Sequence, residues 1–139
     1  MSQTLTGAVA ALQTLASGLS GIKYAPAQVQ NDIVQLPFAI SFPGDGTFEG
    51  GYAHQSQNLA VIVTELHFSN QDMAKGIAQA IPYGDSFLAA LVANPTLSSA
   101  VMAVVFPVTW TFGTLRWGSD GSAHIGYQFK ITVKLENTF

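Results

Sequence analysis

A strict two-residue alternation runs through one stretch of the sequence, His124-Ile125-Gly126-Tyr127-Gln128-Phe129-Lys130-Ile131-Thr132-Val133-Lys134-Leu135. Each odd-numbered residue in it is large and apolar, whereas each even-numbered residue is polar or small. Because successive side chains of a β-strand point to opposite faces of the sheet, the pattern predicts a strand with its odd-numbered side chains in the core. A cluster of Gly, Ser and Asp before it, from Trp117 to Ser122, predicts a hairpin turn.

Three further segments predict strands. Val101 to Trp117 is expected to pair with the alternating strand, with Thr109 and Thr111 on one face and an apolar row on the other: Val104, Phe106, Val108, Trp110 and Phe112. Leu59 to Phe68 is apolar on both faces over its first half, which is typical of a central strand. Leu36 to Pro43 alternates large and small residues between two prolines, which favours an edge strand with one face inward.

Glycines follow this edge strand and predict a turn over Gly44 to Thr47. The next segment, Phe48 to His54, is expected to form either another strand or a mobile loop, because Gly50 and Gly51 add backbone freedom. Lys23 to Gln35 is expected to be an extended connection.

Two helices are predicted. The first, Leu5 to Leu19, has apolar residues at steps of three and four, which indicates one buried face. The second is expected to begin at the capping pattern Ser69 to Asp72 and to end at Asn94-Pro95. Pro82 and Gly84 predict a break within it. Residues 1–139 are therefore expected to form a single α+β domain, a mainly antiparallel sheet with an N-terminal helix and a broken central helix packed on it.

The composition favours self-association. Apolar residues make up 48% of the chain and charged residues only 9%, against roughly 25% in an average soluble protein. Such a chain is expected to cover part of its surface with copies of itself or with partners. The formal net charge is −3 and the cationic residues are scattered, so no basic stripe predicts nucleic-acid binding.

Other classes of site find little support. There is no cysteine, which excludes disulfides and thiolate chemistry. No run of about 18 apolar residues predicts a membrane span, and the first residues lack the features of a signal peptide, so we expect production in a cytoplasm and no membrane partner. Glu65 and His67 should share a strand face as two metal ligands do, but a strand-end pair half in solvent is the commoner arrangement.

No nucleophile elbow, phosphate-binding loop or dinucleotide fingerprint is present, and His54 and His124 have no motif partner. We therefore expect no catalytic residue, cofactor or metal. A small ligand-binding or hydrolytic domain with a pocket between helix and sheet stays an alternative, although it requires convergent polar groups that the predicted inward positions lack.

One segment resembles a known family: Leu91-Val92-Ala93-Asn94-Pro95-Thr96-Leu97-Ser98-Ser99-Ala100-Val101. In the tail terminator and tail-completion proteins of long-tailed phages, a helix similarly ends in Asp/Asn-Pro-Thr-Leu, two small residues follow, and a β-strand begins. This chain has Ser98-Ser99 where the family commonly has glycines. The likeness also includes the N-terminal helix, a Leu36-Pro37-Phe38 strand and the final hairpin, so it spans most of the chain.

The resemblance implies a phage structural protein without enzymatic activity. Such proteins form a ring, typically a hexamer, that caps the tail tube, ends its polymerisation and meets the head-tail connector protein, and DNA passes through the ring without being read. The expected location is the virion tail, after assembly in the host cytoplasm. Aromatic residues in the two Gly-rich segments, Phe48, Tyr52 and Trp117, are the expected interface residues. Another phage neck or tail-tube protein is the alternative.

Overall fold

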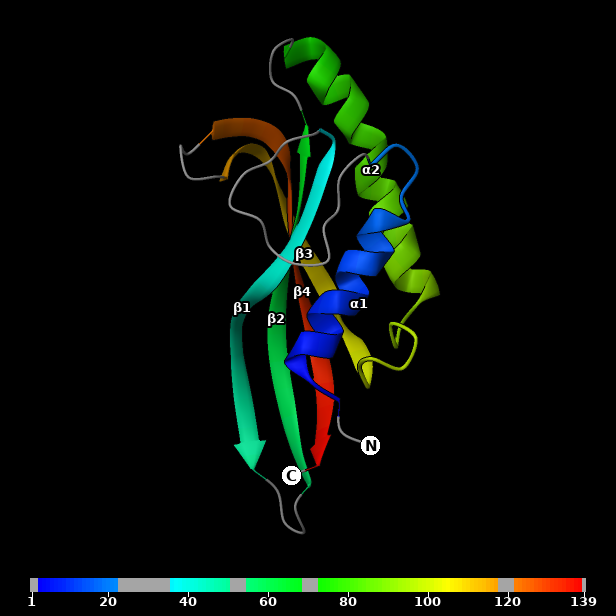
Figure 1. Cartoon of the computed structure of the whole chain (residues 1–139), viewed down its shortest axis with the longest axis vertical. Coiled ribbons are helices and arrows are strands. Elements are labelled where there is room, and N and C mark those ends of the chain that lie inside the picture. Colours follow the sequence, from blue (N-terminus) through cyan, green and yellow to red (C-terminus); the bar gives the residue numbers. More distant parts are fainter. Residues whose placement is uncertain (1–2, 23–35, 51–54, 69–72, 118–121, 139) are drawn as a thin grey trace.

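A four-stranded antiparallel sheet and two helices make up the computed structural model, which describes residues 3–22, 36–50, 55–68, 73–117 and 122–138 (Figure 1). The elements are, in chain order, α1 (Leu5–Ser17), β1 (Phe38–Gly50), β2 (Gln55–Phe68), α2 (Met73–Ala93), β3 (Ala103–Trp117) and β4 (Ser122–Thr138). The strand order across the sheet is β1-β2-β4-β3, with antiparallel pairing throughout. The predicted α+β class is confirmed.

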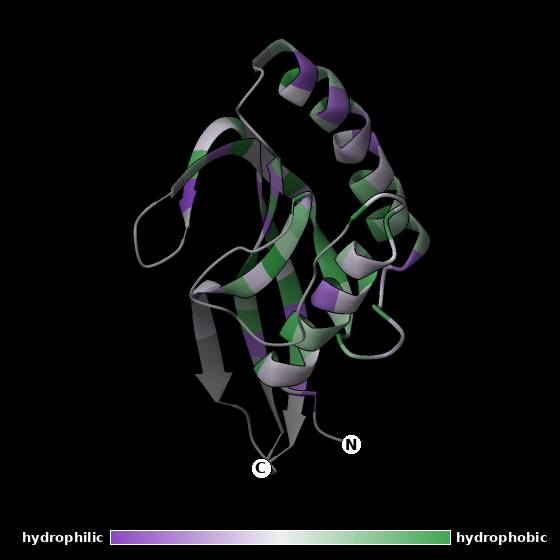
Figure 2. Cartoon of the chain, turned by 45° about the horizontal axis from the view of Figure 1, so that its top comes forward, coloured by the Kyte–Doolittle hydropathy of each residue, from purple (hydrophilic) through white to green (hydrophobic). Residues whose placement is uncertain are grey.

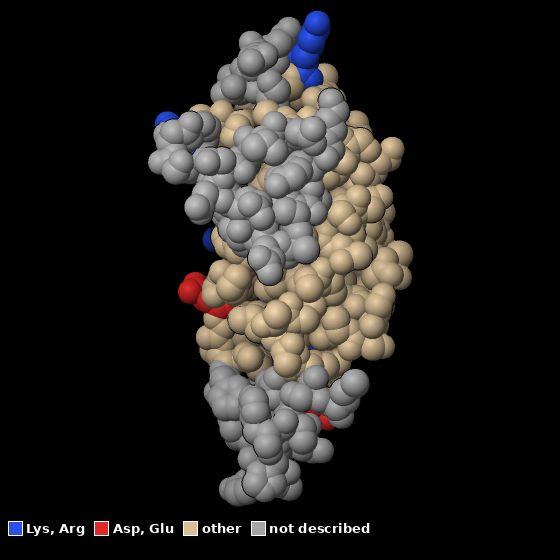
Figure 3. All heavy atoms as spheres, viewed as in Figure 1, with Lys and Arg blue, Asp and Glu red and all other residues tan. Residues whose placement is uncertain are grey.

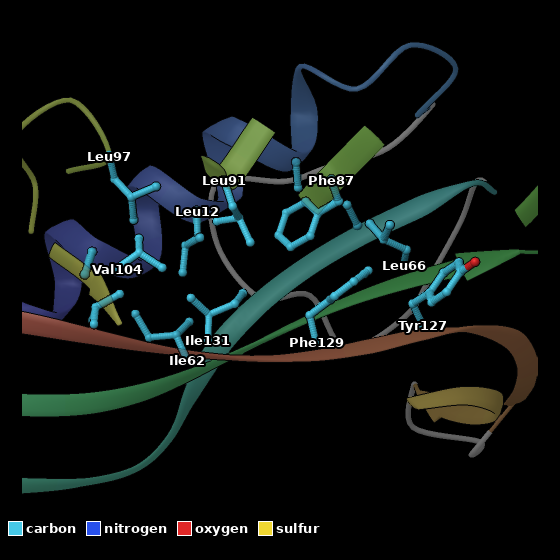
Figure 4. Packing of buried hydrophobic residues seen from close by; sticks show 14 of the residues in the cluster. Leu12, Ile62, Leu66, Phe87, Leu91, Leu97, Val104, Tyr127, Phe129 and Ile131 are labelled. Atoms are coloured by element: carbon cyan, nitrogen blue, oxygen red, sulfur yellow. The ribbon is translucent and has the colours of Figure 1, made fainter. Parts of the chain in front are cut away.

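Both helices lie on the same side of the sheet (Figure 1). Thr4 caps α1, because its hydroxyl accepts a hydrogen bond from the Gly7 backbone N–H. The core forms where the helices meet β4 and β2: Leu12 of α1 and Phe87 and Leu91 of α2 face Phe129 and Ile131 (Figure 4). Figure 2 shows hydrophobic residues, in green, along the strands and along parts of both helices.

Strand β4 confirms the predicted alternation. Its odd-numbered side chains are buried in the core: Ile125, Tyr127, Phe129, Ile131, Val133 and Leu135. The even-numbered residue Lys130 is exposed on the opposite face. Strand β2 lies between β1 and β4, as predicted for a central strand. It is buried on both faces over residues 62–68, whereas Leu59, in the half that the sequence predicted to be covered, is exposed.

Strand β1 corrects the predicted turn at Gly44 to Thr47. The strand runs through these residues to Gly50, with a register irregularity between Pro43 and Gly46. A Cβ at Gly46 would lie 2.7 Å from the Leu59 carbonyl oxygen of β2, so this glycine permits a close approach of two strands. For Phe48 to His54 the sequence left a strand or a loop open. The structure shows a strand as far as Gly50, as the continuation of β1, and residues 51–54 lie outside the described part.

The inward face of β1 also differs from the expectation. Ala39, which pairs with Leu66, belongs to the core under the helices. Phe38 and Ile40 point to the opposite face of the sheet and are nevertheless buried. The edge position of β1 is confirmed, and the extended connection predicted for Lys23 to Gln35 lies outside the described residues.

Helix α2 is continuous, so the predicted break at Pro82 and Gly84 is wrong. Ala80 before the proline and Phe87 after it are both fully buried, which holds the two halves on one core. Gly84 has a packing role, because a Cβ there would lie 2.9 Å from the Tyr127 ring. The helix ends at Ala93, immediately before Asn94-Pro95, as predicted, and the proposed capping pattern at 69–72 is outside the described residues.

The turn that links α2 to β3 contains three successive residues with left-handed backbone: Leu97, Ser98 and Ser99, with φ values of 48°, 56° and 70°. The turn is held by backbone hydrogen bonds from Ala100 N–H to the Leu97 carbonyl and from Val101 N–H to the Thr96 carbonyl. In the described parts of the chain, neither helix has the length and hydropathy needed to cross a membrane.

Candidate functional site

A buried polar network lies on the sheet face opposite the helices. Glu65 Oε1 lies 2.8 Å from His67 Nε2. The other carboxylate oxygen, Oε2, accepts a hydrogen bond of 2.8 Å from the Gln128 side-chain amide. His67 Nδ1 is 3.2 Å from Nδ1 of His124. Because an ionised carboxylate only accepts, His67 donates from Nε2, and one of the two facing Nδ1 atoms carries the hydrogen of the second contact.

The sequence predicted only part of this network. Glu65 and His67 share a strand face, as expected, but they are 5% and 0% exposed, so the expectation of a pair half in solvent is wrong. Phe38 on the neighbouring edge strand pairs with His67 and packs edge-on against its ring, with centroids 5.9 Å apart. His124, which had no motif partner in the sequence, joins the network because β4 places it diagonally across from His67.

The chemistry open to this network is narrow. Both Glu65 oxygens accept hydrogen bonds from protein side chains, and His67 is buried under its neighbours. Among the residues that the structure describes, no group of three His, Cys, Asp or Glu side chains could hold a metal ion. The arrangement orders four side chains of β2 and β4 within the sheet: Glu65, His67, His124 and Gln128.

A second feature is the row of exposed aromatic residues on β3, which we call the aromatic edge: Phe106, Trp110 and Phe112, whose side chains are 52%, 51% and 37% exposed. Helix α1 packs on β1 and β2 and helix α2 on β4 and β2, so β3 lies at the rim of the covered area. The sequence placed these residues on one face with Val104. Val104 is buried beside the core, whereas the aromatic edge extends beyond the cover of the helices.

Stacked rings fix the aromatic edge to the core. The rings of Trp110 and Phe112 lie 5.7 and 4.9 Å from that of Tyr127, and the Tyr127 ring stacks at 5.3 Å on Phe129. The Tyr127 hydroxyl donates to the Ile81 carbonyl of α2 at 3.2 Å. Burial, and secondarily the negative charge of Asp85, raise the pKa of Tyr127. The rings of Trp110 and Phe112 are therefore held in place by Tyr127.

The residues expected at an interface are placed only partly. Phe48 and Trp117 lie in strands β1 and β3, opposite Asn58 and Ser122. A strand was one of the two options for Phe48, and Trp117 ends β3, as it ends the strand predicted from Val101. Tyr52 lies outside the described residues. The sequence placed Trp110 and Phe112 in the apolar row of their strand, and their exposure could not be read from the alternation alone.

An apolar groove with a volume of about 630 Å³ lies between α1 and the C-terminal part of α2. Small residues on α1, Gly7, Ala10 and Ala11, line it on one side. Ala90 of α2, with Asn94, Leu97 and Ser98 of the following turn, lines it on the other. The sequence-based alternative placed a pocket between helix and sheet, whereas this groove separates two helices and carries no charged residue.

Comparisons with known proteins add no relative: no protein-family model matches the chain, and no curated protein matches its sequence.

Proposed function

We propose that the protein is a structural component of a phage tail, which assembles from several copies into a ring that caps the tail tube. The ring ends polymerisation of the tube and offers its other side to the head-tail connector protein, and DNA passes through it unread. The observation that carries this proposal is the aromatic edge, because solvent-exposed aromatic rings fixed on a sheet edge are typical anchors of protein interfaces.

The distribution of charge supports the same function. Helix α1 contains no charged residue, and Figure 3 shows few charged atoms over the helical side of the molecule. A monomer seldom exposes large contiguous apolar areas, whereas subunits of permanent assemblies do. A binder of DNA phosphates would instead carry clustered Lys and Arg, and this chain has five such residues in total.

The turn after α2 supports the family resemblance. Positive φ angles at Ser98 and Ser99 describe a backbone that glycine adopts without cost, and glycine is common at these positions in tail terminator proteins. This agreement concerns the one segment whose sequence most resembles the family.

Electron microscopy of the purified protein, alone and mixed with polymerising tube protein of the same virus, tests the proposal. We expect closed rings and, in the mixture, tubes that stop growing and carry one ring at an end. Long tubes formed by the protein alone would indicate a tail-tube protein instead. Monomers that leave the length of the tubes unchanged would refute the proposed capping function.

A further inference from the structure

Two apolar surfaces of the described chain are exposed, one a row of aromatic rings and the other a groove. The aromatic edge protrudes from β3 with three exposed rings, and the groove between α1 and α2 is a hollow of about 630 Å³. The volume lies within the range of roughly 300–1,000 Å³ that is usual for pockets that bind apolar groups. The side chains that form the aromatic edge and those that line the groove are uncharged, although Asp85 lies near Tyr127 beside the aromatic edge.

We propose that the groove of one copy receives the aromatic edge of a second copy. This inference rests on the proposed function, since it names the contact that joins neighbouring subunits of the ring. The occupant is the same chain, because its own sheet edge supplies the large apolar side chains for which the groove has space.

The lining of the groove suits aromatic rings. Gly7, Ala10 and Ala11 project at most a methyl group, which creates the depth, and Leu97 adds an apolar wall. Asn94 donates its amide nitrogen to the Ala90 carbonyl at 2.8 Å, so its side-chain oxygen remains an acceptor. A buried indole N–H, such as that of Trp110, requires an acceptor of this kind.

Helix α2 lies between the two surfaces, so one copy does not fill its own groove. The groove is on the side of α2 that faces α1, which packs on β1 and β2, whereas the aromatic edge is on β3, at the opposite edge of the sheet. Each copy can therefore use both surfaces at once, and such a head-to-tail contact generates a ring when its rotation closes.

The aromatic edge is prepared for this contact before it forms. Trp110 and Phe112 already rest on Tyr127, so little side-chain freedom is lost on docking. Pro107, which has no backbone N–H, and the register irregularity between Val105 and Thr109 interrupt the outer edge of β3. A strand of a second copy is therefore not expected to pair continuously with the backbone of β3 at this point. The side chains of the aromatic edge then make the contact between the two copies.

Site-directed cross-linking tests the contact, and the absence of cysteine makes it clean. We would place one cysteine in the groove, Thr14→Cys, and one on the face of Phe112, Thr114→Cys, both at exposed positions. The two variants, purified separately, are treated with a short bismaleimide alone and after mixing. We expect a cross-linked dimer in the mixture and at least about tenfold less in either variant alone, since the contact joins unlike surfaces.

Matched variants identify the surfaces involved. Ala10→Glu puts a charge in the groove, and Ala89→Glu puts the same charge on an exposed alanine of α2 outside it. We expect Ala10→Glu and Trp110→Ser each to lower the yield of the cross-link about tenfold or more, as loss of an interface anchor does. Ala89→Glu should leave the yield unchanged, and circular dichroism should show the same fold in all three.

The outcomes separate this inference from the proposed function. Cross-links of equal yield within Thr14→Cys alone would mean that like surfaces meet, and would overturn the inference. Rings in the microscope without the mixed cross-link would overturn it as well, while the capping function stood. A mixed cross-link in particles that form open filaments or leave tube growth unchanged would support the contact and refute the function. Absence of both cross-link and association would overturn the contact.

Discussion

Leu97, Ser98 and Ser99 hold backbone conformations that L-amino acids rarely adopt. A left-handed conformation costs a residue with a side chain roughly 1–2 kcal/mol. The surrounding structure holds the turn in place, since the Leu97 side chain is buried and the Gln3 side chain donates to the Ser99 carbonyl. Strain of this kind persists only where the neighbours determine the chain path, and here the path leads from α2 into the sheet.

Replacing Ser99 by glycine should therefore stabilise the protein. We expect Ser99→Gly to raise the free energy of unfolding by about 1 kcal/mol, because glycine adopts positive φ without the steric cost. The control is Ser86→Gly at an exposed position inside α2, which should lower it by about 0.5–1 kcal/mol. Urea denaturation measures both. Equal losses in the two variants would show that the turn is not strained at residue 99.

The pair Glu65 and His67 should behave as a unit. His67→Leu removes one of the two hydrogen-bond donors to the buried Glu65 carboxylate and should cost about 3 kcal/mol. The double variant Glu65→Leu, His67→Leu also removes the charge, so it should be less destabilised than His67→Leu alone. Urea denaturation of the two single variants and the double variant gives the comparison. Additive losses would mean that the pair is energetically uncoupled.

Tyr127 should make stability depend on pH in the alkaline range. Burial and then Asp85 raise its pKa in the folded protein, so the folded state holds its proton more tightly than the unfolded chain. The resulting stabilisation is complete below the ordinary tyrosine pKa of about 10 and is lost as the pH rises through the folded value.

Tyr127→Phe should remove this dependence. The variant loses the hydrogen bond to the Ile81 carbonyl, at a cost of about 1 kcal/mol at neutral pH. The difference in unfolding free energy between wild type and variant should shrink as the pH rises above about 10. Urea denaturation over this range is the measurement, and a difference that stays constant would contradict the role assigned to Tyr127.

Among the elements, β4 was predictable because one physical demand fixes its pattern. Its odd-numbered side chains face a core covered by helices, and its even-numbered side chains face away. The sequence of β4 therefore alternates between apolar residues and polar or small ones. Strand β1 was not predictable in the same way. Its glycines at 44 and 46 resemble a turn, but Gly46 is needed because β1 approaches the β2 backbone closely, which depends on a strand distant in the sequence.

The candidate site shows the same limit. The alternation in β3 predicted that Trp110 and Phe112 share a face with Val104, and the pairing with β4 bears this out. Which of them is buried depends on how far α2 extends over the sheet, and no local pattern encodes that. Likewise, the strand period predicted that Glu65 and His67 are neighbours, whereas His124 joins them only through the register of β2 and β4.

Helix α2 should gain stability when its internal proline is removed. Pro82 lacks the N–H that would bond to the Ala78 carbonyl, and it is exposed, so little packing is lost with it. We expect Pro82→Ala to raise the free energy of unfolding by about 1–3 kcal/mol. Ala89→Pro, at another exposed position of the same helix, should lower it by about 3 kcal/mol. Thermal melts measure the two stabilities. A Pro82→Ala variant that melts at a lower temperature than the wild type would contradict the prediction.

For the whole molecule, the scarcity of charge predicts how association responds to salt. If the aromatic edge and the groove drive assembly, the association constant should change little between about 0.05 and 0.5 M sodium chloride, because no ion pair is screened. Ammonium sulfate should strengthen it, since excluded salts favour apolar burial. Light scattering across these conditions is the test. A steep decline with sodium chloride would point to an electrostatic contact instead.

The pairing of Gln3 with Glu136 brings the two ends of the chain together. The Gln3 backbone N–H donates to the Glu136 carbonyl at 2.8 Å, and the Glu136 N–H donates to the Gln3 side-chain oxygen at 2.9 Å. Both ends accordingly lie at one pole of the molecule (Figure 1). A short linker could join them, and new termini could then be opened elsewhere by circular permutation. Affinity tags attached before Gln3 or after Glu136 would crowd the same pole and leave the opposite one clear.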